Sequence, residues 1–222
     1  TAEALDLLRE DDRFDFILTM YNVGEPDVFS FAKIVKERHP NTPVALLTSF
    51  SKDIYRRIEE QDRSGLDYIF SWHGNTELII AIIKLVEDKM NAEEDISVGG
   101  VQAILLVEDS IRFYSTYLPE IYKLLLLQNT EFLKDAFNEQ QQVLRKRARP
   151  KILLARCYEE AVELYDRYKQ NLLGVISDVG FVLHREDPAE SEKPDAGIDL
   201  CRRIKNDNPL MPVLLQSSQT AF

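Results

Sequence analysis

Residues 103–110 read Ala-Ile-Leu-Leu-Val-Glu-Asp-Ser, a short apolar run that ends in two carboxylates and a hydroxyl. A continuous apolar run of this length, from Ala103 to Val107, predicts a strand that is buried on both faces, as in a parallel sheet covered by helices. Glu108 and Asp109 would then mark the carboxyl end of the strand, which is where open α/β sheets bind their ligands.

Similar apolar runs alternate with amphipathic segments along the rest of the chain. The predicted strands are residues 14–20, 43–48, 67–71, 103–107, 151–155, 174–178 and 212–216. The predicted helices are 28–38, a segment from about 52, 75–90, 110–145, 158–169 and 198–206. The segment 110–145 is either one very long helix or two helices that are broken near 127–130. This alternation is typical of an α/β fold in which helices cover both faces of parallel sheets.

The composition limits the function classes that need to be considered. The 222 residues include 27 Lys+Arg and 38 Asp+Glu, which gives a net charge of −11. Such an acidic chain is a poor candidate for nonspecific binding to nucleic acid or to anionic membranes. Its apolar runs are far shorter than the roughly 20 residues of a membrane helix, and its first residues lack the features of a signal peptide. We therefore expect a cytoplasmic protein, with Cys157 and Cys201 unpaired.

The strand pattern occurs twice. Residues Ile17–Met20 align with Val175–Asp178, and Pro43–Ser49 align with Pro212–Ser218. The two copies begin and end at different places in the repeat, so we expect the chain to be a part of a longer polypeptide. The expected organisation is a first domain at 1–92, a linker at 93–101 and a second domain at 102–222.

Four polar residues follow the predicted strands of the second copy. Glu108 and Asp109 end its first strand, Asp178 ends its third, and Ser217 follows its fourth. In a flavodoxin-like strand order these strands are near neighbours, so we expect the side chains to converge. Clustered carboxylates repel one another unless a divalent cation lies among them, and oxygen-only ligands suit Mg²⁺. A carboxylate beside Mg²⁺ is a credible nucleophile toward a phosphoryl group.

These residues resemble the CheY-like receiver domains of two-component signalling. The resemblance implies a five-stranded, flavodoxin-like sheet in each copy, with each copy incomplete in this chain. It further implies that Asp178 is the phosphoacceptor and that Ser217 contacts the phosphoryl group. Glu108 and Asp109 would bind Mg²⁺ together with Asp178 and the backbone carbonyl of Gly180. The family's lysine at the end of the fifth strand has no counterpart among residues 102–222.

The first copy departs from the receiver pattern. Met20 stands where the phosphoacceptor would be, and a thioether cannot accept phosphate. Ser71 and Trp72 stand where the family has its lysine and a following proline. Thr48 remains at the hydroxyl position but has no phosphoryl group to contact. We therefore predict that residues 1–92 form a pseudo-receiver, which serves packing and contacts.

The paired arrangement resembles the receivers that precede the PEP/pyruvate-binding domain in relatives of phosphoenolpyruvate synthase. The residues that carry this resemblance are 104–110, 147–155 and 173–178. It implies a signalling module rather than an enzyme, with an output domain elsewhere in the polypeptide. Its expected partner is a histidine kinase or a small-molecule phosphodonor. We expect the chain to bind neither nucleic acid nor a membrane.

Two alternatives to this function remain open at the level of sequence. One is a scaffold in which neither copy is phosphorylated; the apolar residues of the long segment 111–145 predict an interface, either between two protomers or with the first copy. The other is a Mg²⁺-dependent phosphohydrolase with an aspartyl nucleophile. Such enzymes commonly carry a second acid two residues after the nucleophile, and Gly180 in that place argues against this alternative.

Overall fold

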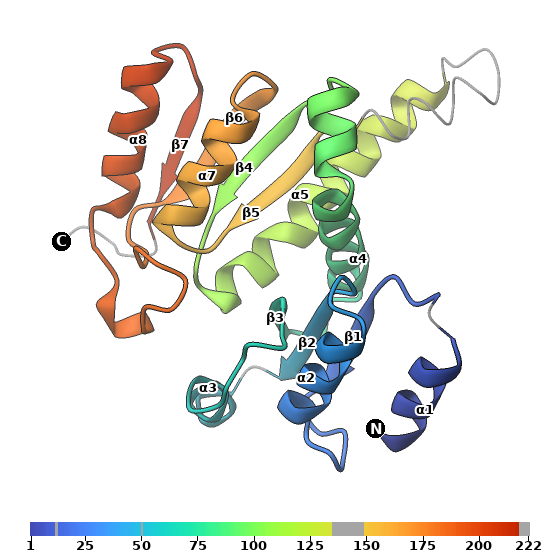
Figure 1. The fold of residues 1–222 in the computed structure, drawn as a ribbon. Helices are drawn as coiled ribbons and strands as arrows, with labels where there is room; N and C mark the ends of the chain where they lie inside the picture. Colours follow the sequence, from blue (N-terminus) through green and yellow to red (C-terminus); the bar gives the residue numbers. More distant parts are fainter. Residues whose placement is uncertain (12, 50, 135–148, 218–222) are drawn as a thin grey trace. The chain divides into compact units, whose positions relative to one another are not determined.

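The structure is a computed structural model that describes residues 1–11, 13–49, 51–134 and 149–217 (Figure 1). The chain divides into two compact units, which are Thr1–Leu78 and Ile79–Phe222. Each unit is an α/β structure with one wholly parallel sheet, as the alternation of strands and helices predicts. In the described parts of the chain, no helix has the length and apolar character needed to cross a membrane.

The first unit contains a three-stranded sheet in the order β1-β2-β3. Its elements are α1 (Ala2–Glu10), β1 (Ile17–Met20), α2 (Val28–Arg38), β2 (Val44–Ser49), α3 (Lys52–Glu59) and β3 (Tyr68–Trp72). The central strand β2 is buried along nearly all of its length. Asp27 directly precedes helix α2, and its carboxylate accepts hydrogen bonds from the backbone amides of Phe29 and Ser30 and so caps the helix. Helix α1, which the sequence did not predict, packs Leu8 against α2.

The second unit contains a four-stranded sheet in the order β5-β4-β6-β7. Its strands are β4 (Ala103–Val107), β5 (Lys151–Ala155), β6 (Leu172–Asp178) and β7 (Val213–Gln216). Its helices are most of α4 (Glu77–Met90), η1 (Glu93–Val98), α5 (Ile111–Lys134), α7 (Tyr158–Tyr168), η2 (Ala189–Ser191) and α8 (Ala196–Asp207). The second strand in chain order lies outside the first, and the third and fourth follow on the other side. This order is consistent with a flavodoxin-like fold.

The sheets contain the seven strands that the apolar runs of the sequence predict, and the expectation that each copy is an incomplete five-stranded sheet stays a prediction. Three strands form the first sheet and four form the second among the described residues. Helix α5 continues without a break through 127–130 as far as Lys134, so the alternative of two helices broken at that point is wrong. Residues 135–145 of the predicted long helix lie outside the described residues.

The segment that the sequence predicts as a linker packs into the second unit. Residues Glu93–Val98 form η1, in which Ile96 is fully buried. Ile96 and Ala92 belong to the same core cluster as the residues of β4 and α7. The Asp95 carboxylate also lies 2.7 Å from the ammonium group of the buried Lys151. The division between the compact units accordingly falls after Leu78, earlier than the expected end of the first domain at residue 92.

A buried ion pair explains why α4 belongs with the second sheet. Asp88 of α4 is fully buried, and its two oxygens accept hydrogen bonds at 2.6 and 2.9 Å from the guanidinium of Arg149. The hydroxyl of Tyr122 and the backbone amide of Ile152 also donate to Asp88, at 2.8 and 3.0 Å. A buried carboxylate is tolerated when its charge is paired and its oxygens are hydrogen-bonded. These contacts join α4 to α5 and β5.

The two halves of the internal repeat share one strand register. Ile17 of β1 pairs with Val44 of β2, and the aligned Val175 of β6 pairs with Val213 of β7. The turns before the second strand of each pair are also built alike. Lys36 donates to the carbonyl oxygens of Pro40 and Thr42, and Lys205 donates to those of Pro209 and Met211. The sequence repeat is therefore a structural repeat.

Candidate functional site

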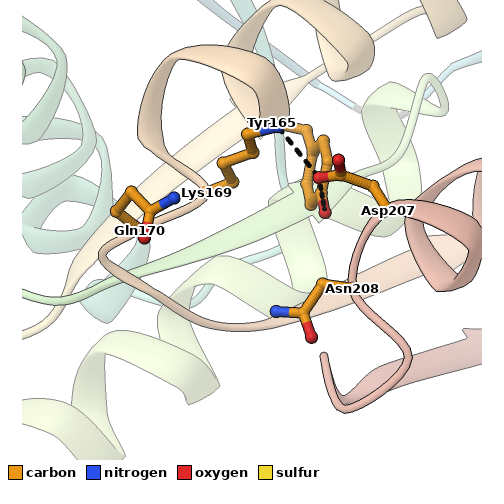
Figure 2. A pocket seen from close by; sticks show the side chains of 5 residues that line it. All are labelled: Tyr165, Lys169, Gln170, Asp207 and Asn208. Carbon is orange, nitrogen blue, oxygen red and sulfur yellow. Dashed lines mark hydrogen bonds and ion pairs between the residues drawn. The ribbon is translucent and has the colours of Figure 1, made fainter.

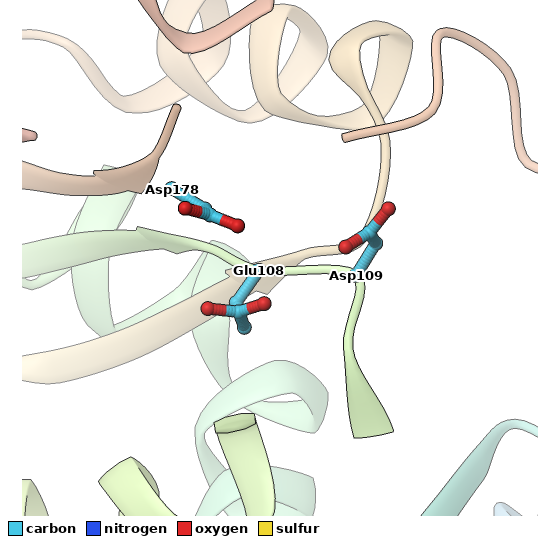
Figure 3. A group of neighbouring side chains, drawn as sticks. All are labelled: Glu108, Asp109 and Asp178. Carbon is cyan, nitrogen blue, oxygen red and sulfur yellow. The ribbon is translucent and has the colours of Figure 1, made fainter. Parts of the chain in front are cut away.

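Three carboxylates meet at the carboxyl ends of β4 and β6 (Figure 3). Val107 of β4 is the register partner of Ser177 of β6, so Glu108 and Asp178 follow neighbouring positions in the sheet. Glu108, Asp109 and Asp178 each place an oxygen atom within 4.8 Å of the other two. The parallel register of two adjacent strands therefore creates this cluster of negative charge.

Glu108 is the most buried member of the cluster, with 1% of its surface exposed. Its backbone amide extends the ladder of β4 by donating to the carbonyl of Ala155, at 3.0 Å. Its side-chain oxygens accept hydrogen bonds from the amide of Ser110, at 3.2 Å, and from the side-chain amide of Gln216, at 3.4 Å. Helix α5 starts directly after Ser110, so the turn between β4 and α5 also orients this carboxylate.

Backbone amides hold the other two carboxylates. Val182 donates to Asp109 at 3.2 Å, and Val179 donates to Asp178 at 2.7 Å. The backbone at Asp178 is closely packed as well, because its carbonyl oxygen lies where a side chain on Gly197 would be. Only glycine fits at position 197, and its amide donates to the carbonyl of Val179 at 2.9 Å. The start of α8 therefore packs directly against the end of β6.

Burial and mutual repulsion disfavour the charged forms of these carboxylates. The pKa of Glu108 is raised to about 8, mainly by burial and then by the charge of Asp178. The pKa of Asp109 is raised to about 6 by burial, by the charge of Glu192 and by that of Asp178. Burial also raises the pKa of Asp178. A cation among these oxygens would remove the repulsion that raises the pKa values.

The donor set fits a divalent cation that prefers oxygen ligands. Three carboxylates supply hard oxygen donors, and their oxygens are close enough together to share one ion. Mg²⁺ is commonly held by a few carboxylates while it keeps several of its waters. Clustered acidic groups also occur without a metal. The binding of an ion here, and its identity as Mg²⁺, therefore stay predictions.

The two other residues that the resemblance implies lie next to the cluster along the chain. Gly180 is buried in the turn that follows β6. Ser217 is exposed and comes directly after Gln216, which is the register partner of Asp178. The roles of the Gly180 carbonyl as a metal ligand and of Ser217 as a phosphoryl contact stay predictions.

Three residues near the cluster were missed by the sequence reasoning. Gln216 contacts Glu108, and its place as the last, polar residue of an apolar strand was an available signal. Tyr117 of α5 lies near enough to Glu108 and Asp178 for their charges, after burial, to raise its pKa. Glu192 affects Asp109 from a distant part of the chain. No sequence pattern would place Tyr117 or Glu192 at this edge of the sheet.

A small polar pocket of about 210 Å³ lies at the other end of the strands (Figure 2). It is lined by Tyr165, Lys169, Gln170, Asp207 and Asn208. The Tyr165 hydroxyl and the Lys169 ammonium group both donate to the same oxygen of Asp207, at 3.0 and 2.9 Å. These bonds connect the C-terminal ends of α7 and α8. The polar side chains of the pocket therefore serve the packing of the two helices.

Comparisons with known proteins identify no family for this chain. A scan against protein-family models found no match, and a search of curated proteins found no relative. The functional argument therefore rests on the carboxylate cluster and on the residues that surround it.

Proposed function

We propose that the second unit is a receiver module that accepts a phosphoryl group on Asp178 with the help of Mg²⁺. The observation that carries this proposal is the meeting of Glu108, Asp109 and Asp178 at the ends of two adjacent parallel strands. Ligands of open α/β sheets bind at this edge. A cluster of carboxylates that includes a buried Glu108 is costly without a cation, which supports a binding role over a purely structural one.

The environment of Asp178 suits a nucleophile. The amide of Val179 holds one carboxylate oxygen at 2.7 Å and so orients the group. In the proposed step, an oxygen of Asp178 forms a bond to phosphorus while the bond from phosphorus to the donor breaks, and the electron pair leaves with the donor. Bound Mg²⁺ supplies charge neutralisation for the phosphoryl oxygens. Glu108, Asp109 and the Gly180 carbonyl would hold the ion, and Ser217 would contact the phosphoryl group.

The signal would leave the site through β7. Gln216 contacts Glu108, and Ser217 follows it at the exposed end of the strand. A phosphoryl group bound at Asp178 would favour one arrangement of this strand end and so bias an interaction surface. In this proposal the donor is a histidine kinase or a small phosphodonor, the first unit is a pseudo-receiver, and the output belongs to a PEP/pyruvate-binding type of domain elsewhere in the polypeptide.

A scaffold function is the second candidate. Leu124 and Leu127 of α5 are 62% and 57% exposed, and both lie in the segment 111–145 for which the sequence predicts an interface. Exposed leucines on one helix favour contact with a partner surface, such as a second protomer. Under this alternative, the carboxylate cluster would take no phosphoryl group.

Binding of beryllofluoride with Mg²⁺ separates the two functions, because beryllofluoride mimics a phosphoryl group on a carboxylate. We expect Mg²⁺ and beryllofluoride together to raise the melting temperature of the chain by more than Mg²⁺ alone. Asp178→Asn should abolish this increase, whereas Asp166→Asn, on the exposed side of α7, should retain it. An equal melting temperature with and without beryllofluoride in the wild type would favour the scaffold.

A further inference from the structure

The loop between β6 and α8 is anchored beside the carboxylate cluster. Phe181 and Lys193 form an antiparallel bridge, in which each backbone amide donates to the other residue's carbonyl, at 3.3 and 3.1 Å. Val182, next to the bridge, donates to Asp109. The amides of Tyr158 and Glu159 at the start of α7 donate to the carbonyls of residues 182 and 183. The second half of the loop is therefore held in a defined position beside the site.

The bridge places the Glu192 side chain against the turn that follows the acceptor. A side chain on Gly180 would collide with the Glu192 carboxylate, so the two residues are in close contact. Gly180 comes two residues after Asp178, so this contact brings the Glu192 carboxylate close to the end of β6. Glu192 is therefore a fourth carboxylate beside the three that form the cluster, although it is exposed and lies outside the group that could share one ion.

The cations of the loop are engaged elsewhere. Residues 185–195 contain five acidic and two basic residues. Arg185 pairs with Glu160 at 2.9 Å, and Lys193 pairs with Asp199. Within the described parts of the chain, no ion pair involves Glu192. Its negative charge therefore lies beside the turn that follows Asp178, without an ion-pair partner in those parts of the chain.

The geometry points to Glu192 as a selectivity residue that slows the reaction of Asp178 with small, free phosphate-bearing anions. This inference rests on the proposed function. A carboxylate beside the site repels an incoming dianion such as acetyl phosphate, and salt weakens that repulsion. A protein donor that presents its phosphoryl group beside positive side chains would be repelled less. The same charge stabilises a cation nearby, so Glu192 should strengthen Mg²⁺ binding.

The test compares Glu192→Gln and Glu192→Lys with the control Glu190→Gln, which removes an exposed charge from the same loop. At saturating Mg²⁺ and low ionic strength, we expect Glu192→Gln to raise the second-order rate of phosphorylation by acetyl phosphate about 3- to 10-fold. Glu192→Lys should raise it further. In about 0.5 M salt the phosphorylation rates of the wild type, Glu192→Gln and Glu192→Lys should converge, because screening shortens the range of the repulsion.

Calorimetry of Mg²⁺ binding gives a second readout that does not depend on phosphorylation. Glu192→Gln should weaken Mg²⁺ binding about 3- to 10-fold, whereas Glu190→Gln should leave it nearly unchanged. Opposite changes in cation affinity and anion reactivity are the signature of a charge that acts through space.

Three outcomes would overturn the inference. Equal rates for Glu192→Gln and Glu190→Gln would show that the Glu192 charge is irrelevant. A large loss of both Mg²⁺ affinity and rate in Glu192→Gln would make Glu192 a metal ligand instead. Failure of the wild type to react with acetyl phosphate at any salt concentration would reject the proposed function and this inference with it, whereas a reactive wild type with unchanged Glu192 variants rejects the inference alone.

Discussion

Met20 and Asp178 occupy the same position in two sheets that share one register. Met20 ends β1 and pairs with Leu47 of β2, while Asp178 ends β6 and pairs with Gln216 of β7. In one copy of the repeat the strand thus ends in a thioether, and in the other it ends in a carboxylate. Among the described residues, the group around Asp178 is the one cluster of three side chains that could hold a metal. The equivalent strand ends therefore differ in their capacity for chemistry, even though their backbones match.

Restoring a carboxylate in the first unit should not restore reactivity. In the double variant Met20→Asp/Asp178→Asn, we expect no phosphoryl adduct with acetyl phosphate and Mg²⁺, because a lone aspartate lacks the neighbouring carboxylates that hold the cation. Intact mass spectrometry measures the adduct, with the wild type as the positive control. An adduct that peptide mapping places at position 20 of the double variant would refute the description of the first unit as a pseudo-receiver.

The metal-free protein should lose stability as the pH rises. The pKa of Glu108 is about 8 in the folded state against an ordinary value of 4.5, so the folded state binds more protons between these values. The unfolding free energy should therefore fall between about pH 4.5 and pH 8. Asp109, with a pKa of about 6, adds to the fall in the lower part of this range.

Glu108→Gln removes one charge from the cluster and tests this explanation. At pH 8 without metal, we expect the variant to be more stable than the wild type by about 1–3 kcal/mol, or roughly 2–4 °C in melting temperature for each kcal/mol. Mg²⁺ should stabilise the wild type and have little effect on the variant. A wild type whose stability is flat from pH 5 to pH 8, measured by urea denaturation in EDTA, would contradict the raised pKa values.

The buried pair of Asp88 and Arg149 should contribute strongly to the stability of the second unit. Asp88→Asn leaves the guanidinium buried without its counter-charge, so we expect a loss of about 3–5 kcal/mol in urea denaturation. The matched control is Asp166→Asn, which removes the exposed pair with Arg203 at 2.9 Å and should cost less than about 1 kcal/mol. Similar losses in the two variants would contradict the structural assignment of α4 to this unit.

Gly197→Ala should disturb the site through the backbone. The added methyl group would collide with the Asp178 carbonyl oxygen, so the end of β6 or the start of α8 has to move. We expect weaker Mg²⁺ binding in calorimetry together with lower stability. Gly74→Ala, in the first unit, is the control: its φ of +82° makes alanine unfavourable, but no atom lies within 4 Å. Gly74→Ala should reduce stability and leave Mg²⁺ affinity unchanged. If Gly74→Ala weakened Mg²⁺ binding as much as Gly197→Ala, the loss of affinity would follow from lower stability in general and not from a change at the site.

The strands and the three clustered carboxylates could be predicted because they depend on local patterns. Apolar runs such as 103–107 and 151–155 predict buried strands, and a flavodoxin-like order brings the carboxyl ends of β4 and β6 together. Other features depend on contacts between distant segments. The acidic composition of 93–101 concealed the buried Ile96. Glu192 reaches the site only through the bridge between Phe181 and Lys193, which no short-range pattern encodes.

Phosphorylation of Asp178 is the central claim, and intact mass spectrometry of the full chain with Mg²⁺ and acetyl phosphate tests it most directly. We predict one adduct of about 80 Da that is labile to hydroxylamine, as an acyl phosphate is, and that requires Mg²⁺. It should be absent from Asp178→Asn and present in Asp187→Asn, which removes a carboxylate from the loop that follows. The account would be contradicted if no adduct formed in the wild type, or if the adduct persisted in Asp178→Asn.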